Sequence, residues 1–356
     1  MAWLFFRRLL QTVLAVWALA SGVFLLSHLE GSTAVELARP DLAELPTTGS
    51  AATPAARQAL EQTTRHRLGL DIPLFYVGTH TPTAATAGRW HWNGLPNQYH
   101  RWLSETLHGR FGTSFRTGES VASRLRQALL FTLPLTGTAA GLAVGLALVL
   151  AQRLATRPRW HRPVRGILVA LQALPLFVIA LGLLLLFANP EILAWFPSYG
   201  LEQTTDADLD AASQLGYYLW HMALPVMALM LSALPELTLQ LNAALEQELG
   251  ADYATTARAK GLPERAVISR HALRNALLPS LAQLAELLPA LVAGAVVVEV
   301  AFALPGMGRL LAEAAAARDF PVLVGGVLLV GTARLLALLI TDLLALWADP
   351  RIRWHH

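Results

Sequence analysis

The residues best placed to couple this chain to a moving partner lie in one polar segment between two apolar stretches. Residues 246–279 read EQELGADYATTARAKGLPERAVISRHALRNALLP and contain Lys260, the only lysine in the chain. Gly261 is placed to end a helix, and Pro263 cannot continue that helix but can stand in the first turn of another. The pattern therefore predicts a helix over 246–260, a sharp bend, and a second helix over about 264–273.

A bent pair of helices presents a compact knob, and such a knob fits a groove on a partner protein. A partner that moves would then turn the knob together with the apolar segments that flank it. The alternative is an amphipathic helix lying on the lipid surface. Glu246, Glu248 and Asp252 argue against that alternative because anionic headgroups repel carboxylates. The residues alone leave both interpretations open.

A few ionisable residues interrupt the apolar stretches, where a charge is costly and tends to face protein or water. One hypothesis is that Glu236 or Glu286 lines a translocation pathway and that Arg334 pairs with one of them. Pro289 follows Glu286 closely, and a proline often marks a kink. The alternative is a structural ion pair between helices, or a side chain that reaches the membrane interface. The candidate pathway residues are Glu236, Glu286, Glu299 and Arg334.

Several catalytic chemistries are excluded by the residue types that the chain lacks. The absence of cysteine removes a thiolate nucleophile and a Cys-ligated metal. A phosphate-cradling loop needs Gly-Lys before Ser or Thr, and Lys260 is followed by Gly261. No His-Glu-x-x-His or Gly-x-Ser-x-Gly pattern occurs. We therefore expect a non-catalytic chain without metal or cofactor, and any ATP hydrolysis on another polypeptide.

The composition is that of an all-α membrane protein. Hydrophobic residues make up 54% and charged residues only 14%, against roughly 25% charged residues in soluble domains. The net charge of +3 could suggest nucleic acid, but the basic residues stand at the ends of apolar blocks and form no patch. Six segments are long enough to cross a bilayer as helices. They lie at about 9–29, 128–151, 166–188, 219–241, 276–300 and 322–347.

The distribution of arginine predicts the orientation of these segments. Basic residues gather before the first span, between spans two and three, between spans four and five, and after span six. Both termini are therefore expected in the cytoplasm. The predicted parts are an uncleaved anchor (1–30), an external segment (31–127), a five-helix core (128–347) with the polar loop at about 246–274, and a tail (348–356).

Shorter features are expected between the spans. A helix at about 98–108 should be followed by a turn between Gly109 and Gly112. The region 303–322 should form a Pro-Gly-x-Gly turn and a short Ala-rich external helix. Gly137, Gly141 and Gly145 stand four apart in the second span, a spacing that favours close helix packing.

Blocks along most of the chain resemble the permease subunits of ATP-binding-cassette importers, and in particular the dipeptide, oligopeptide and nickel permease family. The polar segment carries two of them, DYATTARAKGL (252–262) and HALRNALLP (271–279). Further blocks follow the family's order: LGLDIPL (68–74), GRFGTSFRTGESV (109–121), LPLFVIALGLLLLF (174–187), GAVVVEVAFALPGMGRLLAEAAAARDFPV (294–322) and ADPRIR (348–353). The chain departs from the family at Glu30-Gly31-Ser32-Thr33, where Pro-Gly-Asp-Pro is common, and at Arg334.

The resemblance implies a type I importer permease that forms half of a pathway in the bacterial cytoplasmic membrane. Its partners would be a second, different but homologous permease, two ATPase subunits that bind ATP and Mg²⁺, an external substrate-binding protein and membrane lipid, with no nucleic acid. Substrates in the family include dipeptides, oligopeptides, nickel complexes, glutathione and peptide-like antibiotics. A secondary transporter that needs no motor is the alternative.

The resemblance also implies which residues contact the ATPase. In this interpretation Gly261 provides the bend, Ala257 a close fit, and Lys260 a partner for carboxylates of the motor. The residues of the predicted coupling loop are Asp252, Tyr253, Ala257, Arg258, Ala259, Lys260 and Gly261.

Overall fold

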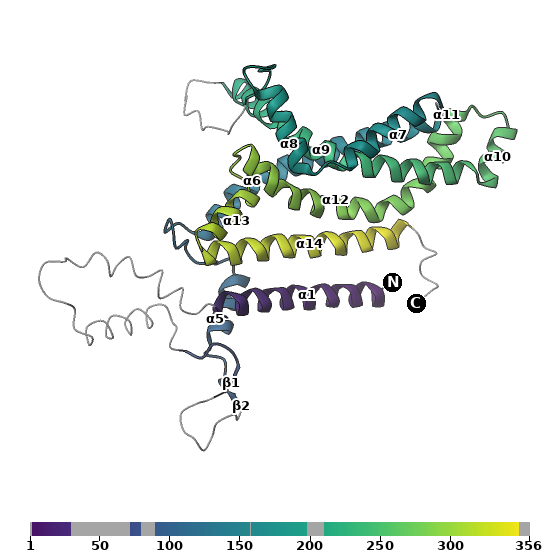
Figure 1. Ribbon diagram of the computed structural model, residues 1–356. Helices are drawn as coiled ribbons and strands as arrows, with labels where there is room; N and C mark the ends of the chain where they lie inside the picture. Colours follow the sequence, from purple (N-terminus) through teal and green to yellow (C-terminus); the bar gives the residue numbers. More distant parts are fainter. Residues whose placement is uncertain (1, 30–71, 80–89, 157, 198–209, 349–356) are drawn as a thin grey trace, which may run out of the picture. The chain divides into compact units, whose positions relative to one another are not determined.

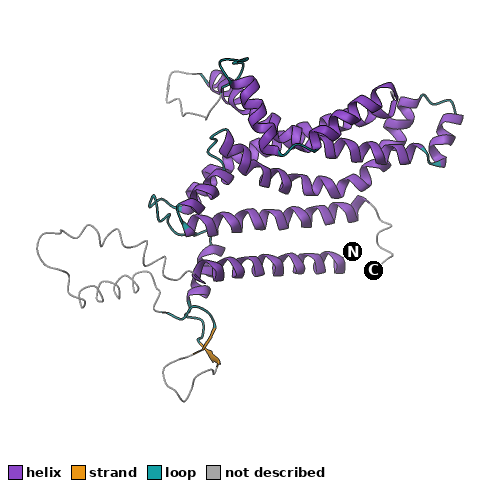
Figure 2. Cartoon of the chain, in the orientation of Figure 1, coloured by secondary structure: helices purple, strands orange, loops and turns teal. Residues whose placement is uncertain are grey.

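A computed structural model describes residues 2–29, 72–79, 90–156, 158–197 and 210–348. Helices make up most of this part of the chain (Figure 2). The chain divides into two compact units, which are described separately below. The first comprises Met1–Val16, Arg126–Ala316 and Val330–His356, and the second comprises Trp17–Leu125 and Ala317–Leu329.

Five long helices dominate the described residues and can be followed in Figure 1. Three helical stretches in the described residues are long and apolar enough to cross a membrane by themselves: Val121–Thr156, Ala212–Leu249 and Phe320–Leu339. Shorter apolar helical stretches occur at Leu9–Leu25 and Pro289–Ala301. The chain is thus a helical membrane protein, and the full count of six spans stays a prediction. The five helices are α1 (Ala2–Leu29), α6 (Val121–Thr156), α9 (Ala211–Leu249), α12 (Leu273–Ala301) and α14 (Phe320–Ala348).

The expected single helix at 166–188 is wrong. It is replaced by α7 (Pro158–Gln172) and α8 (Leu176–Leu183), which are bent by 102° at a short break, and α8 continues into the π-helix η1 (Leu184–Ala188). Pro175 stands at the break, where it has no N–H to donate and disfavours a helical residue before it. Pro175 stands as the extended N-cap of α8, with ψ 144°.

The core of the first unit lies where α8, α9 and α12 meet. Leu229 of α9 and Val298 of α12 are completely buried there. A Cβ added to Gly294 of α12 would lie 3.0 Å from Leu176 Cδ2 and 3.4 Å from Leu229 Cδ2. This glycine therefore permits α12 to approach both neighbouring helices closely.

A short helix, α13 (Met307–Ala316), follows α12 after a tight turn, which confirms the predicted Pro-Gly-x-Gly turn and Ala-rich helix. The turn passes against α12 at very short range. A Cβ on Gly308 would lie 2.4 Å from Val296 Cα, so only glycine fits at this position.

The second unit contains α5 (Gln98–Leu107) and a hairpin of β1 (Val77–Thr79) and β2 (Trp90–Trp92). The strands are antiparallel, with Gly78 opposite His91. Asn97 caps α5 by accepting a hydrogen bond from the backbone N–H of His100 at 2.8 Å. The predicted helix at 98–108 is confirmed. Gly109 and Gly112 follow it with φ of +73° and +80°, so the predicted glycine turn is confirmed as well.

A buried carboxylate organises another part of the second unit. Asp319 is 2% exposed and accepts hydrogen bonds from the Ser114 hydroxyl and, at 3.1 Å, from the backbone N–H of Phe115. Arg124 Nη1 lies 3.7 Å from Asp319 Oδ2 and donates to Ser114 Oγ at 3.1 Å. The turn at 111–121 is thereby tied to the residue that precedes α14.

The glycine ridge of α6 has no close neighbour in the described residues, so the expected close packing is not found there. Gly137, Gly141 and Gly145 are exposed, and a Cβ added to any of them meets nothing within 4 Å in the described residues. The close approach that this spacing favours is therefore open to another molecule.

Candidate functional site

The polar segment lies at one end of the paired helices α9 and α12 (Figure 1). The expected unbroken helix over 246–260 is wrong, because α9 ends at Leu249 with Gly250 as its C-cap. Glycine is a weak helix former, and Asp252 favours the start of a new helix because a carboxylate is stabilised at a helix N-terminus. The new helix is α10, Asp252–Ala259.

The predicted bend after α10 is confirmed and has the geometry of a Schellman motif. Gly261 has φ +79°, which L-residues with a Cβ adopt only with strain. Its N–H donates to the Arg258 carbonyl at 2.9 Å, and the Leu262 N–H donates to the Ala257 carbonyl at 3.3 Å. Leu262 also packs against the small apolar cluster beneath α10. Gly261 thus supplies the backbone conformation on which the bend depends.

The segment after the bend is not a separate second helix. Pro263 is the extended N-cap of α11 (Glu264–Ala266), which runs through the π-helix η2 (Val267–Ala272) directly into α12. A π-helical turn is rare and inserts a residue into the helical pattern. The bend is therefore joined to α12 by continuous helix, whereas the connection to α9 passes through the break at Gly250.

Arg258 fastens the three pieces of the segment together. Its Nε and Nη2 donate to the two carboxylate oxygens of Glu264 at 3.0 and 2.8 Å, and its Nη1 donates to the Leu249 carbonyl at 3.0 Å. The Leu249 carbonyl belongs to the last turn of α9, where carbonyls have no helical partner. The hydrogen bonds from Arg258 lower the pKa of Glu264 below its ordinary value. Arg258 therefore bridges the end of α9, α10 and α11.

The inner face of α10 is packed against the start of α12's continuous helix. Ala254 and Val267 are completely buried, and Ala257 is 7% exposed, in one cluster. The Tyr253 hydroxyl donates to Glu248 Oε2 at 2.6 Å, and burial, aided by this carboxylate, raises the pKa of Tyr253. Ala257 packs in this cluster inside the chain, and its expected close fit against a motor stays a prediction.

The outer face of the segment is open. The other residues of the predicted coupling loop, apart from the partly buried Tyr253, are exposed, and their contact with a motor stays a prediction. They are Asp252, Arg258, Ala259, Lys260 and Gly261.

Of the candidate pathway residues, Glu299 is completely buried and accepts three hydrogen bonds. The donors are Thr132 Oγ1 at 2.6 Å and the backbone N–H groups of Gly308 at 2.7 Å and Arg309 at 3.1 Å. Thr132 Oγ1 in turn accepts from the Met307 N–H at 2.8 Å. A carboxylate is well stabilised at the N-terminus of α13. This geometry favours a structural role that joins α6, α12 and α13.

The other three candidates are exposed. Glu236 accepts a hydrogen bond from Gln240 Nε2 at 3.2 Å, one turn along α9. Glu286 lies on α12 and Arg334 on α14. In the part of the chain that the structure describes, Arg334 forms no ion pair with either glutamate, so the predicted pairing is not found there.

Two contacts of the candidate residues were missed by the analysis of the sequence. Thr132 stands 167 residues from Glu299, and no pattern connects them. Arg258 and Glu264 are six residues apart, which is not a neighbouring spacing on a helix, and meet only because of the bend. Only Gly261 could have indicated the second contact, because a turn at this glycine brings the side chains of Arg258 and Glu264 together.

The fold and this segment define a class of protein: a helical membrane protein with an ordered polar bend between two long helices. Residues 143–354, which include α9, the bend and α12, match the family described as binding-protein-dependent transport system inner membrane component. The chain belongs to this family.

Relatives that are similar over most of the chain have names that agree with this family. The probable D,D-dipeptide transport system permease protein of Escherichia coli is 33% identical, over 83% of this chain and 85% of the relative. An oligopeptide transport system permease protein of Bacillus subtilis is 31% identical over 72% of this chain and 80% of its own length. An oligopeptide transport system permease protein of Escherichia coli is 30% identical, with 73% and 81% covered.

The resemblance seen in the sequence blocks is therefore confirmed. The chain is a permease subunit of an ATP-binding-cassette importer, a non-catalytic part of a transporter that also contains ATPase and binding-protein components. A motor-independent secondary transporter is not favoured.

Proposed function

We propose that the chain forms half of a pathway for the uptake of peptides or related small solutes across the bacterial cytoplasmic membrane. The observation that carries the substrate class is the similarity, over most of the chain, to proteins named for dipeptide and oligopeptide transport. Nickel complexes, glutathione and peptide-like antibiotics are the other substrates to be tested.

The proposed topology has six spans and cytoplasmic termini, with α1 as anchor, 31–127 outside, 128–347 as the core and 348–356 as a cytoplasmic tail. The clusters of arginine between the spans support this orientation. The bent pair α7 and α8–η1 serves as the third span. In this arrangement α10 and the bend at Gly261 lie in the cytoplasm.

The proposed assembly contains a second, different but homologous permease, two ATPase subunits that hold ATP and Mg²⁺, and an external substrate-binding protein. No cofactor is expected on this chain. The exposed glycine ridge of α6 supports an additional membrane partner, and the exposed outer face of α10 supports a soluble one.

In the mechanism that we infer, the bend transmits force from the ATPase to the membrane helices. The Arg258 bridge and the Schellman motif make the segment compact, and the continuous helix through η2 connects it to α12. Closure of the ATPase on nucleotide would displace α10, and α12 would move with it, while the hydrogen bond from Arg258 to the Leu249 carbonyl links the end of α9 to the same movement. The two arrangements of the pathway then alternate, outward and inward facing.

Affinity purification of the detergent-solubilised chain from its native membrane, with mass spectrometry of the partners, tests this function. The wild type should recover an ATPase subunit, a second permease and a peptide-binding protein. Gly261→Asp should lose the ATPase and keep the second permease. If the wild type recovers no ATPase while other membrane complexes from the same extract remain intact, the proposed function is wrong.

The substrate class needs a separate measurement. Uptake of a labelled dipeptide and a labelled oligopeptide should be abolished in cells that lack this chain and restored by its expression. If the deletion changes only uptake of nickel, the proposed peptide substrate is wrong and the nickel branch of the family is correct.

A further inference from the structure

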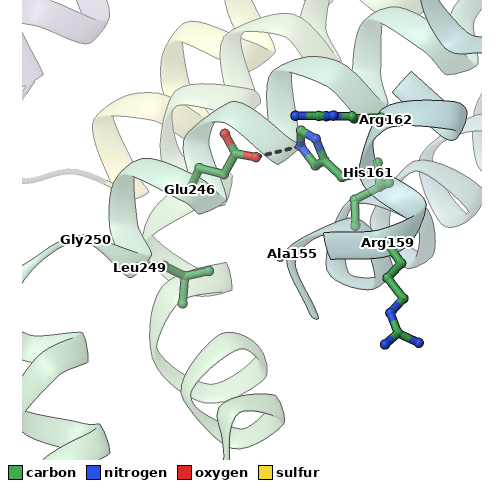
Figure 3. A pocket seen from close by; sticks show the side chains of 8 residues that line it. Ala155, Arg159, His161, Arg162, Glu246, Leu249 and Gly250 are labelled. Atoms are coloured by element: carbon green, nitrogen blue, oxygen red, sulfur yellow. Dashed lines mark hydrogen bonds and ion pairs between the residues drawn. The ribbon is translucent and has the colours of Figure 1, made fainter. Parts of the chain in front are cut away.

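A pocket of about 930 Å³ lies between the end of α6, the start of α7 and the end of α9 (Figure 3). It has one apolar wall and one charged wall, which is the lining expected for an amphiphilic ligand. The apolar wall is formed by Leu154, Ala155 and Leu249, and the charged wall by Arg159, His161, Arg162 and Glu246. Gly250, the C-cap of α9 at the break before α10, completes the lining.

The single carboxylate of the pocket is already engaged. Glu246 Oε1 lies 2.9 Å from His161 Nε2 and accepts a hydrogen bond from Asn242 Nδ2 at 2.8 Å. Figure 3 shows the guanidinium of Arg162 beside the His161 ring, and the Arg159 side chain directed away from Glu246. Both arginine side chains are exposed, so their charges are available to an anion.

The position of the pocket in the chain indicates the source of such an anion. Two apolar helical stretches that could cross a membrane end at Thr156 and Leu249, a few residues beyond the spans expected at 128–151 and 219–241, and the pocket is built from their last turns. The end of a membrane span lies at the level of lipid headgroups. Basic pockets between spans on the cytoplasmic side suit the headgroups of anionic lipids, because one guanidinium group can donate two parallel hydrogen bonds to phosphate oxygens.

We propose that this pocket binds the phosphodiester headgroup of an anionic phospholipid from the cytoplasmic leaflet, with the charges of Arg159 and Arg162 attracting the phosphate from either side of the pocket and Leu154, Ala155 and Leu249 against the first acyl carbons. The inference uses the membrane placement of the proposed function. It does not require any particular transport substrate.

The proposed lipid site lies next to the segment that is expected to couple the ATPase to the membrane helices. Leu249 lines the pocket, and its carbonyl accepts the hydrogen bond from Arg258 that fastens the end of α9 to the bend. A bound lipid would therefore contact the break at Gly250, where the polar segment begins. Nucleotide hydrolysis by the assembled transporter should accordingly depend on anionic lipid.

The test uses the whole purified transporter in nanodiscs that contain phosphatidylcholine with a minor fraction of phosphatidylglycerol, and native mass spectrometry of the retained lipid. Arg159→Gln combined with Arg162→Gln should reduce retained phosphatidylglycerol roughly tenfold. Arg153→Gln combined with Arg165→Gln is the matched control, because it removes equal charge from neighbouring exposed arginines that do not line the pocket. This control should retain the lipid.

An equal loss of lipid in both pairs of variants would show nonspecific attraction and overturn the proposal. Displacement of the lipid by millimolar glycerol 3-phosphate, with tight binding of that soluble phosphate, would assign the pocket to a soluble anion and overturn the lipid assignment. These outcomes differ from failure of the proposed function, in which the wild-type chain recovers no ATPase at all.

Discussion

At the scale of single residues, Glu299 shows how a charge in an apolar stretch can have a structural role. Its carboxylate is fully buried, and its donors come from α6 and from the start of α13. A Cβ on Gly306 would lie 2.1 Å from the Glu299 carboxyl carbon, so the turn fits the carboxylate only with glycine there. The carboxylate thus fixes the position of the turn between α12 and α13.

Replacing Glu299 by Gln should destabilise the purified chain by about 1–3 kcal/mol, because an amide nitrogen faces N–H donors that then lack an acceptor. The measurement is the thermal unfolding midpoint in detergent. Glu286→Gln is the matched control, since Glu286 lies exposed on the same helix. Equal midpoints for wild type and Glu299→Gln would contradict the structural role.

Glu286 itself remains a candidate for the pathway. Glu286→Gln should leave recovery of the partner subunits unchanged and alter the rate of peptide uptake, because only the charge that faces the proposed pathway is removed. Uptake equal to that of the wild type would exclude Glu286 from the pathway.

The Arg258–Glu264 pair predicts a pH dependence of the bend. The pKa of Glu264 is lowered in the folded chain, so the pair stabilises the bend above the ordinary glutamate pKa of 4.5, and this stabilisation is lost as pH falls through the lowered value. Because both side chains are exposed, the effect should be small. Glu264→Gln should lower the unfolding midpoint at neutral pH and not at acid pH. A difference that persists in acid would contradict this origin.

At the scale of elements, the bend after α10 depends on one backbone conformation. Gly261→Ala should cost about 1–2 kcal/mol locally, because a Cβ is strained at positive φ. Hydrogen exchange at the amides of α10 should accelerate, and recovery of the ATPase should fall. Gly166→Ala is the matched control: its Cβ also meets open space, but Gly166 lies in the regular helix α7. Unchanged exchange in Gly261→Ala would show that the bend does not need a left-handed residue.

In the second unit, the turn at 111–121 depends on Asp319. Asp319→Asn should increase protease cleavage in this turn, because the replacement removes the charged acceptor of Ser114 and Phe115 and leaves Arg124 beside a neutral amide. Glu119→Gln is the control. Its carboxylate also lies 3.7 Å from Arg124 but is exposed, so its loss should have little effect. Equal cleavage in both variants would contradict the role of Asp319.

At the scale of the whole molecule, the exposed ridge of α6 predicts where the second permease binds. Gly141→Leu should reduce recovery of that subunit, because a large side chain prevents close helix approach. Gly216→Leu, at another exposed glycine with open space around it, should not. If both variants recover the second permease fully, the interface lies elsewhere.

The sequence by itself determined the class of the molecule and the place of its bend. Apolar stretches long enough to span a bilayer can satisfy their backbone only as helices, and Gly261 before Pro263 ends one helix and begins the next through purely local sterics. The short helix α5 and the glycine turn after it were predicted for the same reason, since capping and turn preferences act over a few residues.

Only the tertiary structure decided how distant residues meet. The hydrogen bond from Thr132 to Glu299, the inward packing of Ala257 on Val267 and the tie between Asp319 and Ser114 depend on which helix faces fold together. The breaks at Pro175 and Gly250 also needed it: both residues disfavour helix, yet proline and glycine are tolerated inside other helices of this chain, such as α9 with Pro225 and Pro235. Local propensity leaves that choice open, and packing against neighbouring helices settles it.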